Sequence, residues 1–336
     1  MPRVSVLLPV RDAASTLDAC LDSLAAQTLS DHEVVAVDDG SRDGSGERLL
    51  ARARLDRRLR VLRTPPRGLV AALGRALGEA RAPLVARMDA DDLARSERLA
   101  LQAERLERDA SVDVLGCRVS VTPSTDAPVG EGMRAYVEWQ NGLVDHDTMA
   151  RDRFVESPLV HPSVATRTTG LRALGGWRDL DGPEDYDLWL RAFDAGLRFA
   201  KLAETLLEWR DSPGRLSRTD PRYAPARFLA LKVEALGRGP LARPRPVVLW
   251  GAGRVGKAWS RALRAAGHEL RAFVEVDPRK VGGRLHGVPV LAVREAGALR
   301  GALHLAAVGQ RGARERIREE AARLGLADGE DLVAVA

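Results

Sequence analysis

Short apolar segments alternate with longer segments of helical periodicity along the first ninety residues of the chain. The apolar segments lie at 4–10, 33–37, 59–62 and 83–86. The segments between them place apolar residues at helical spacing over 15–27, 45–54 and 69–80. Strands that alternate with helices of this length predict βαβ units in a mostly parallel sheet. Because ligands of such sheets bind beyond the carboxyl ends of the strands, we expect an α/β protein with its site at that edge.

The pattern changes near residue 237. Residues 237–246 are rich in Gly, Pro and Arg, a composition that is typical of a linker. A new strand–helix pattern begins at Val247. We therefore expect a first domain over 1–238, a linker over 239–246 and a second α/β domain over 247–336. A length of 336 residues is enough for two domains.

Composition places the chain among ordinary globular proteins. Hydrophobic residues make up 45% and charged residues 29% of the chain, which argues against a disordered or fibrous protein. No apolar run approaches the roughly 20 residues of a transmembrane helix, and the first apolar run is too short for a secretory signal. Two cysteines are too few for a disulfide framework or a cysteine-based metal site. We expect a cytoplasmic protein without a transmembrane segment.

The net charge of +5 does not by itself indicate a nucleic-acid partner. Only four of the 52 basic residues are Lys, so the excess of Arg is interpreted as a compositional bias with solvated helix surfaces. Aromatic residues, at 4%, are too scarce for base-stacking platforms. We expect no nucleic-acid partner. The alternative for the Arg-rich surface is peripheral contact with the anionic inner face of a membrane.

Acidic residues follow two of the predicted strands directly. Asp38 and Asp39 come after the strand at 33–37, and Asp89, Asp91 and Asp92 come after the strand at 83–86. Residues two apart in an extended segment point to the same side, as Asp89 and Asp91 would. Two carboxylates on one side can hold a Mg²⁺ or Mn²⁺ ion that also bridges substrate phosphates.

Helix capping is the structural alternative for these acids. Asp92 or Ser96 could cap a helix over 95–107. Glu184 and Asp185 follow a proline, which suits a first helical turn, and acids there interact favourably with the helix dipole. A capping role and a catalytic role are compatible, because a helix N-terminus holds a side chain rigidly.

Four segments in this order and spacing form a specific motif set: SVLLPVR at 5–11, VDDGSRDGS at 37–45, ARMDADD at 86–92 and GPEDYDLWLR at 182–191. On these segments the sequence, over roughly residues 3 to 220, resembles glycosyltransferase family 2. Members of that family are inverting enzymes of GT-A fold that use nucleotide-diphospho-sugars. The resemblance implies a GT-A mostly parallel sheet for the first domain.

The resemblance also implies the residues that bind the nucleotide. Pro9, Val10 and Arg11 would line the nucleotide pocket at the end of the first strand. Asp39 would accept a hydrogen bond from the imide N–H of the base, a donor that uracil and thymine carry. Arg67 lies near a position that contacts the nucleotide in the family.

A metal site and a catalytic base follow from the same resemblance. Asp89, Ala90 and Asp91 match the family's Asp-x-Asp motif, so Asp89 and Asp91 would hold Mn²⁺ or Mg²⁺ on the donor diphosphate. Asp185 matches the catalytic base, with Glu184 beside it. Inverting transfer needs a base on the face of the sugar opposite the leaving diphosphate and positive charge at the leaving group, which these roles supply.

The sequence departs from the family at three places. Gly74 stands where Asn is frequent, with little expected consequence for chemistry. Asp211 and Ser212 follow Arg210 where many relatives have a His that completes the metal shell, so the third metal ligand stays open. His161 matches a family position near the acceptor, although a single His is more often a structural residue.

The second domain begins with a glycine-rich strand–helix junction. Gly251, Gly253 and Gly256 form Gly-x-Gly-x-x-Gly after the strand at 247–250, and Glu275 ends the next strand. This is half of a dinucleotide-binding fingerprint, so the domain is expected to be Rossmann-like and to bind a nucleotide. It is similar to small Rossmann-like domains fused to sugar-modifying enzymes. A purely structural or docking module is the alternative.

The sequence thus predicts a metal-dependent inverting hexosyltransferase that moves a sugar from a UDP- or dTDP-sugar to an acceptor hydroxyl. The acceptor would be a glycan or lipid-linked sugar in cell-surface polysaccharide or glycolipid assembly. Three alternatives remain: a nucleotide-sugar sensor without transfer activity, an NAD-dependent sugar oxidoreductase acting through the second domain, and a nucleotidyltransferase. The last would carry a Gly-rich basic loop after the first strand, and residues 11–14 are not such a loop.

Overall fold

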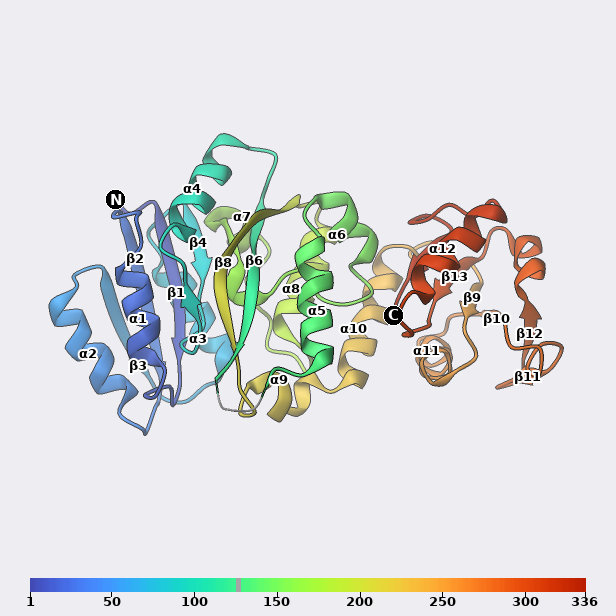
Figure 1. Ribbon diagram of the computed structural model, residues 1–336, viewed down its shortest axis with the longest axis horizontal. Coiled ribbons are helices and arrows are strands. Elements are labelled where there is room, and N and C mark those ends of the chain that lie inside the picture. The colour runs from blue at the N-terminus through green and yellow to red at the C-terminus, as the bar shows by residue number, and fades with distance from the viewer. Residues whose placement is uncertain (125–127) are drawn as a thin grey trace. The chain divides into compact units, whose positions relative to one another are not determined.

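The computed structural model describes residues 1–124 and 128–336. The described chain divides into two compact units (Figure 1). The first unit contains residues 1–146 and 158–222, and the second contains residues 147–157 and 223–336. The domain boundary expected after residue 238 stays a proposal. The division into units rests on proximity and not on independent folding, and it places residues 223–238 with the second unit.

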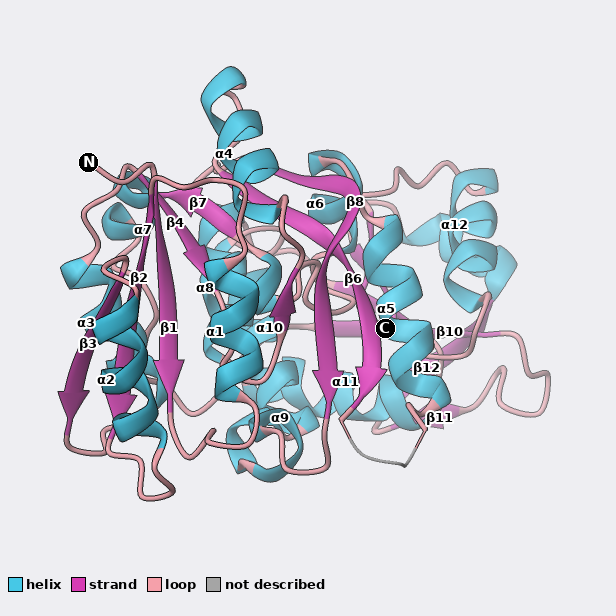
Figure 2. Ribbon diagram, turned by 60° about the vertical axis from the view of Figure 1, so that its left-hand side comes forward, coloured by secondary structure: helices cyan, strands magenta, loops and turns pink. Residues whose placement is uncertain are grey.

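The strands of the first unit form one eight-stranded sheet within its described residues, in the order β3-β2-β1-β4-β7-β6-β8-β5 (Figure 2). The strands are β1 (Val4–Val10), β2 (His32–Asp39), β3 (Leu59–Thr64), β4 (Leu84–Arg87), β5 (Leu93–Ala94), β6 (Val114–Pro123), β7 (Ala165–Arg167) and β8 (Phe199–Asp211). Neighbouring strands are parallel from β3 to β4 and between β6 and β8, whereas β7 and β5 are antiparallel to their neighbours. The predicted mostly parallel sheet is confirmed.

The helical segments up to residue 223 lie between these strands, except for the last two, which follow β8. They are α1 (Leu17–Ala25), α2 (Ser45–Leu55), α3 (Leu69–Glu79), α4 (Arg98–Arg108), α5 (Glu131–Gly142), α6 (His146–Asp152), η1 (His161–Ser163), α7 (Thr168–Ala173), α8 (Glu184–Asp194), α9 (Leu216–Thr219) and η2 (Pro221–Tyr223). The three helices expected before residue 80 are confirmed as α1, α2 and α3. None of the helices in the described parts of the chain combines the length and the apolar content that crossing a bilayer requires.

The capping hypothesis for α4 is wrong. This helix begins at Arg98 after Glu97, and no side chain caps its N-terminus. Asp92 instead accepts the backbone N–H of Arg210 through Oδ1 at 2.9 Å. The pattern could not show this because the partner strand lies more than a hundred residues away in the sequence.

Strand β1 is buried at every position because both of its faces are covered. Val6 and Leu8 on one face belong to a core that also contains Leu21 and Leu24 of α1. Helix α3 packs against β1 and β2 with side chains outside that core, such as Leu73. The apolar run at 4–10 is therefore the central layer of this half of the sheet.

The second unit contains a six-stranded sheet among residues 247–336, all of which are described, in the order β11-β12-β10-β9-β13-β14. Its elements are α10 (Pro225–Arg238), β9 (Val247–Trp250), α11 (Arg254–Ala265), β10 (Leu270–Glu275), β11 (Arg284–Leu285), β12 (Val288–Ala292), η3 (Val293–Leu299), β13 (Leu303–Ala306), α12 (Ala313–Arg323) and β14 (Leu332–Ala334). Only β11 is antiparallel to its neighbour among the described pairs. The five parallel strands follow the order 3-2-1-4-5, which is also the order at the start of dinucleotide-binding sheets.

Candidate active site

The loop after β1 and the loop after β2 are tied together by side chains of the 37–45 motif. Ser41 Oγ accepts the backbone N–H of Asp12 at 3.0 Å, and Asp12 Oδ1 accepts that of Arg42 at 2.8 Å. Asp43 Oδ2 accepts the backbone N–H of Ala14 at 2.7 Å. Much of the motif therefore holds the loop at the carboxyl end of β1 in place, a role that the sequence pattern did not indicate.

The two adjacent acids at the end of β2 have different environments. Asp38 is 1% exposed, and its Oδ2 accepts a hydrogen bond from Arg63 Nε at 3.2 Å. Asp39 accepts the backbone N–H groups of Arg67 and Gly68 at 2.7 and 2.8 Å, one on each carboxylate oxygen. Asp38 therefore shapes the turn, whereas Asp39 joins the end of β2 to the segment that leads into α3.

The structure brings the predicted nucleotide-pocket residues to this one edge of the sheet. Pro9 and Val10 are buried at the end of β1, and the exposed Arg11 places Nη1 3.3 Å from Asp39 Oδ2. The backbone of Arg67 reaches the other oxygen of Asp39, and its side chain is exposed. Thr64 Oγ1 also donates to Asp39 Oδ1 at 3.5 Å, so each carboxylate oxygen already accepts two hydrogen bonds, and a base N–H would have to replace one of the longer ones, from Arg11 or Thr64. The contact of Asp39 with a nucleobase stays a prediction.

Three carboxylates gather just beyond the end of β4. Oxygens of Asp89, Asp91 and Asp92 all lie within 4.8 Å of one another. Asp89 and Asp91 are partly exposed, while Asp92 and the intervening Ala90 are buried. Burial, and after it the charge of Asp89, raises the pKa of Asp91. The same two causes raise the pKa of Asp92 well above its usual range. The cluster therefore concentrates negative charge, which the neighbouring guanidinium groups of Arg87 and Arg215 offset only in part.

The donor set fits a divalent cation. Asp92 Oδ2 is buried and accepts no hydrogen bond from any residue within 1–124 or 128–336. Asp89 forms an ion pair with the buried Arg87, and Arg210 donates from Nε to the backbone carbonyl of Asp91. Mg²⁺ and Mn²⁺ prefer oxygen ligands of this kind. Asp92, for which helix capping was the structural alternative, is the third carboxylate of this cluster.

Asp211 and Ser212 stand at the position after Arg210 where the resemblance leads us to expect a His. Asp211 is buried and pairs with Arg218 at 2.8 Å and with Arg215 at 3.8 Å. The Arg215 guanidinium lies 4.1 Å from the centre of the Trp209 ring. Ser212 is partly exposed. Asp211 is thus already engaged by two guanidinium groups, and Asp92 is the carboxylate that lies with the Asp-x-Asp pair.

Helix α8 carries the predicted base in its first turn. Its N-cap is Pro183, without a side-chain cap, so Glu184 and Asp185 occupy the first turn as expected. Asp185 is partly exposed, and its Oδ1 lies 2.7 Å from the backbone N–H of Tyr186. Glu184 is only 2% exposed. The two neighbouring carboxylates therefore differ in access, and only Asp185 is open to a substrate.

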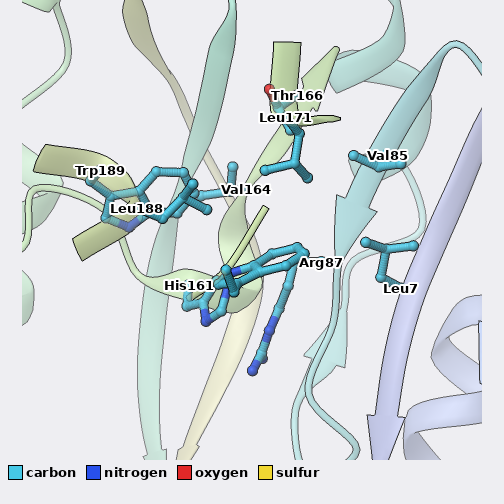
Figure 3. Close-up of a pocket in the computed structure, with 10 residues that line it drawn as sticks. Leu7, Val85, Arg87, His161, Val164, Thr166, Leu171, Leu188 and Trp189 are labelled. Atoms are coloured by element: carbon cyan, nitrogen blue, oxygen red, sulfur yellow. The ribbon is translucent and has the colours of Figure 1, made fainter. Parts of the chain in front are cut away.

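A small cavity lies between β4 and α8. It has a volume of about 10 Å³, and Arg87 and His161 line it side by side (Figure 3). His161 is buried, its Nε2 accepts the indole N–H of Trp177 at 2.9 Å, and its Nδ1 lies 3.8 Å from Glu184 Oε1. Burial and the charge of Arg87 hold the pKa of His161 well below its usual range. The predicted acceptor-side role of His161 stays a prediction.

The glycine-rich junction of the second unit has two glycines that the backbone requires. Gly251 has a φ of +104°, and a Cβ on Gly256 would lie 1.8 Å from the carbonyl oxygen of Gly251. A Cβ on Gly253 would meet no atom within 4 Å. Glu275 accepts the backbone N–H of Ala252 at 3.1 Å, which links the end of β10 to the glycine loop.

Comparison with known proteins agrees with the fold. Residues 5–162 match the family model described as Glycosyl transferase family 2. EpsE of Bacillus subtilis strain 168, described as a glycosyltransferase, is 28% identical over 228 residues, which cover 66% of this chain and 78% of EpsE.

Two solved structures show the same fold at low identity. TarS of S. aureus in complex with UDP is 21% identical, with a TM-score of 0.54 over 70% of this chain and 66% of that chain. The mannosyltransferase PcManGT of Pyrobaculum calidifontis, in complex with GDP-Man and Mn²⁺, is 19% identical, with a TM-score of 0.51 over 79% of this chain and 75% of that chain.

The parallel strand edge with its carboxylate cluster, seen together with these similarities, defines a sugar-transferring enzyme of GT-A-like fold. Residues 5–162 form a domain of the glycosyltransferase family 2 type.

Proposed function

We propose that this chain is a metal-dependent, inverting hexosyltransferase that uses a nucleotide-diphospho-sugar donor. The observation that carries the proposal is the cluster of Asp89, Asp91 and Asp92, whose oxygens lie within 4.8 Å of one another at the edge where Asp39 also lies. Burial and the charge of Asp89 raise the pKa of Asp91 and of Asp92, so a divalent cation would stabilise this site.

Asp89 and Asp91, with Asp92 beside them, would hold Mn²⁺ or Mg²⁺. The ion would supply positive charge to the donor diphosphate as it leaves. PcManGT was solved with Mn²⁺, which supports manganese as the first metal to test. Asp39, with Pro9, Val10, Arg11 and Arg67 around it, would bind the nucleotide.

Asp185 is proposed as the base. Its carboxylate is partly exposed in the first turn of α8, on a different segment from the metal acids. A base so placed can take the proton of the acceptor hydroxyl as that oxygen attacks the anomeric carbon from the face opposite the diphosphate. This geometry inverts the anomeric centre, so an α-linked donor is expected to give a β-linked product.

UDP or dTDP is proposed as the donor nucleotide, since Asp39 suits the imide N–H of uracil or thymine. The UDP complex of TarS supports this choice. The acceptor is proposed to be a hydroxyl of a glycan or lipid-linked sugar in cell-surface polysaccharide or glycolipid assembly. A cytoplasmic location with peripheral contact at the inner face of the membrane stays a prediction.

The test is nucleotide release from UDP-glucose, UDP-galactose, UDP-GlcNAc and dTDP-glucose with Mn²⁺ or with EDTA. Release of nucleoside diphosphate that stops with EDTA supports the proposal.

Asp91→Ala should abolish Mn²⁺-dependent UDP binding in calorimetry, and Asp185→Asn should keep UDP affinity but lower turnover at least ~10²-fold. The same changes at the exposed Asp22 of α1 are the controls. Pyrophosphate release would indicate a nucleotidyltransferase, and binding without release a sensor.

A nucleotide-binding role for the second unit is proposed as well, and its parallel strand order 3-2-1-4-5 favours it. The ligand would lie over Gly253, where a side chain would meet no protein atom within 4 Å, with Glu275 at a ribose hydroxyl. Titration with NADH and with UDP-GlcNAc, in the Asp91→Ala background, tests this role. Gly253→Val should abolish the binding without unfolding the unit; binding that persists would leave the unit a structural or docking module.

A further inference from the structure

The buried histidine of the candidate active site has a fixed proton position. Its Nε2 accepts the indole N–H of Trp177 at 2.9 Å, so Nε2 carries no hydrogen. A neutral imidazole carries a single N–H, which must then be on Nδ1. That nitrogen lies 3.8 Å from Oε1 of Glu184, an electrostatic contact that is longer than a hydrogen bond. Trp177 therefore determines which nitrogen of His161 carries its hydrogen toward Glu184 on α8.

Glu184 connects Trp177 and His161 to the proposed base, Asp185. It is the first residue of α8 and only 2% exposed, so an acceptor cannot reach its carboxylate directly. The next residue, Asp185, is partly exposed. A rotation of the first turn of α8 would therefore move both carboxylates together, and whatever holds Glu184 also holds Asp185.

Arg87 faces the same carboxylate from the metal side. It is buried at the end of β4, forms an ion pair with Asp89 and interacts electrostatically with Glu184. Figure 3 shows its side chain beside His161 in the shared cavity. A cavity of about 10 Å³ holds at most about one water, so little solvent competes with these contacts.

We propose that Trp177, His161 and Glu184 form an orienting relay that fixes the first turn of α8, and with it Asp185, relative to the metal acids. The proposal rests on the role of Asp185 given above. The three side chains are positioning residues: they touch no reacting atom, and Glu184 is not a second base. The relay acts on turnover through Asp185, whereas donor binding depends on the metal acids and on the residues around Asp39.

A neighbouring tryptophan supplies a matched control. Trp189 lines the same cavity, and its ring lies edge-on to His161 at a centroid distance of 6.1 Å. Its indole N–H is buried and donates to no residue in the described part of the chain. Trp189→Phe thus removes similar volume beside His161 without removing a hydrogen bond, whereas Trp177→Phe removes the bond that sets the tautomer.

The kinetic experiment compares Trp177→Phe with Trp189→Phe, both with Mn²⁺ and the UDP-sugar of the panel that gives the fastest UDP release. We expect Trp177→Phe to lower kcat about tenfold while the donor KM and the calorimetric UDP affinity stay within twofold of wild type. Trp189→Phe should stay within twofold in all three quantities. Equal kcat values for the two variants would overturn the relay, because the lost volume and not the lost N–H would then matter.

A second pair of variants covers the case in which Trp177→Phe does not fold. His161→Asn places an amide N–H near the position of Nδ1, whereas His161→Leu places none there. We expect His161→Asn to retain at least about fivefold more kcat than His161→Leu, at equal UDP affinity. Equal turnover would overturn the proposal.

A spectroscopic measurement separates failure of the relay from failure of the proposed function. Imidazole ¹⁵N shifts of His161, assigned by the signals missing in His161→Asn, should show the Nδ1–H tautomer in wild type and in Trp189→Phe, and its loss in Trp177→Phe. An Nε2–H tautomer in wild type would overturn the relay, whatever the activity. If the tautomer is as expected but Asp185→Asn retains full turnover, the assignment of the base is wrong instead.

Discussion

Several buried charges of the first unit are held by backbone groups as well as by opposite charges. Asp39 accepts two backbone N–H groups, and Asp92 accepts one from Arg210. Lys201 on β8 is buried among backbone carbonyls and donates from Nζ to Pro158 O at 3.2 Å. A charge held by dipoles alone is only partly compensated for the loss of water, so its protonation should respond to burial.

Lys201 gives the first prediction at the residue scale. Burial lowers the pKa of its ammonium from 10.5 to about 7. Between pH 7 and 10 the unfolded chain therefore binds a proton that the folded chain has lost, so the free energy of unfolding rises with pH, by up to ~1.4 kcal/mol per unit. Lys201→Met should remove this rise. Urea denaturation at pH 6, 7, 8 and 9 measures it.

The control for Lys201 is the exposed Lys257 on α11. Lys257→Met should leave the pH dependence of unfolding as in wild type. The same slope in Lys201→Met and in wild type would show that the buried amine keeps its proton in the folded state.

At the scale of elements, strand direction explains why distant acids meet. Strands β1, β2 and β4 are parallel, with Val10 opposite Asp38 and Leu7 opposite Arg87 in the register. Their carboxyl ends therefore share one edge, which brings Asp39 and Asp89 to it. This part of the site could be predicted from the sequence, because alternating strands and helices determine strand direction.

Other parts of the site could not be predicted in this way. Asp92 meets Arg210 through β8, and His161 meets Glu184 between η1 and α8. In each contact one residue precedes the antiparallel strand β7 in the sequence and the other follows it. No local pattern therefore determines which residues face each other. For the same reason, local pattern could not distinguish Asp92 as a carboxylate of the cluster from Asp92 as a helix cap.

The strand–loop–helix element at β9–α11 gives the second prediction. Gly256→Ala would place a Cβ 1.8 Å from the carbonyl oxygen of Gly251, so β9 and α11 would have to separate. We expect a loss of ~3 kcal/mol or more in the stability of the second unit. Hydrogen exchange followed by mass spectrometry should show faster exchange in peptides from β9 and α11.

Gly253→Ala is the matched control for this element, since its Cβ would meet nothing within 4 Å. It should change the exchange rates of these peptides little. Comparable exchange in the two variants would mean that the close approach of Gly256 to Gly251 is not a constraint in solution.

At the scale of the whole molecule, the chain does not divide at a single point. Residues 147–157 lie in the second unit although the residues on either side of them lie in the first. Within the second unit, Lys232 donates from Nζ to Val155 O at 2.7 Å, and the buried Asp152 pairs with Arg318. The linker composition of residues 237–246 indicated the change of pattern. A segment as short as 147–157 has no compositional feature that would indicate which unit contains it.

Asp152 therefore gives a prediction about how the second unit is completed. Asp152→Ala would leave Arg318, whose side chain is 16% exposed, without its buried partner, and we expect the second unit to lose ~3–5 kcal/mol. The control is Asp328→Ala, which removes the more exposed partner of Arg318 and should cost ~0–1 kcal/mol. Hydrogen exchange should show faster exchange in 147–157 and α12 for Asp152→Ala alone. Faster exchange confined to β1–β4 would contradict the assignment of this segment, because a loss of stability there would place residues 147–157 with the first sheet.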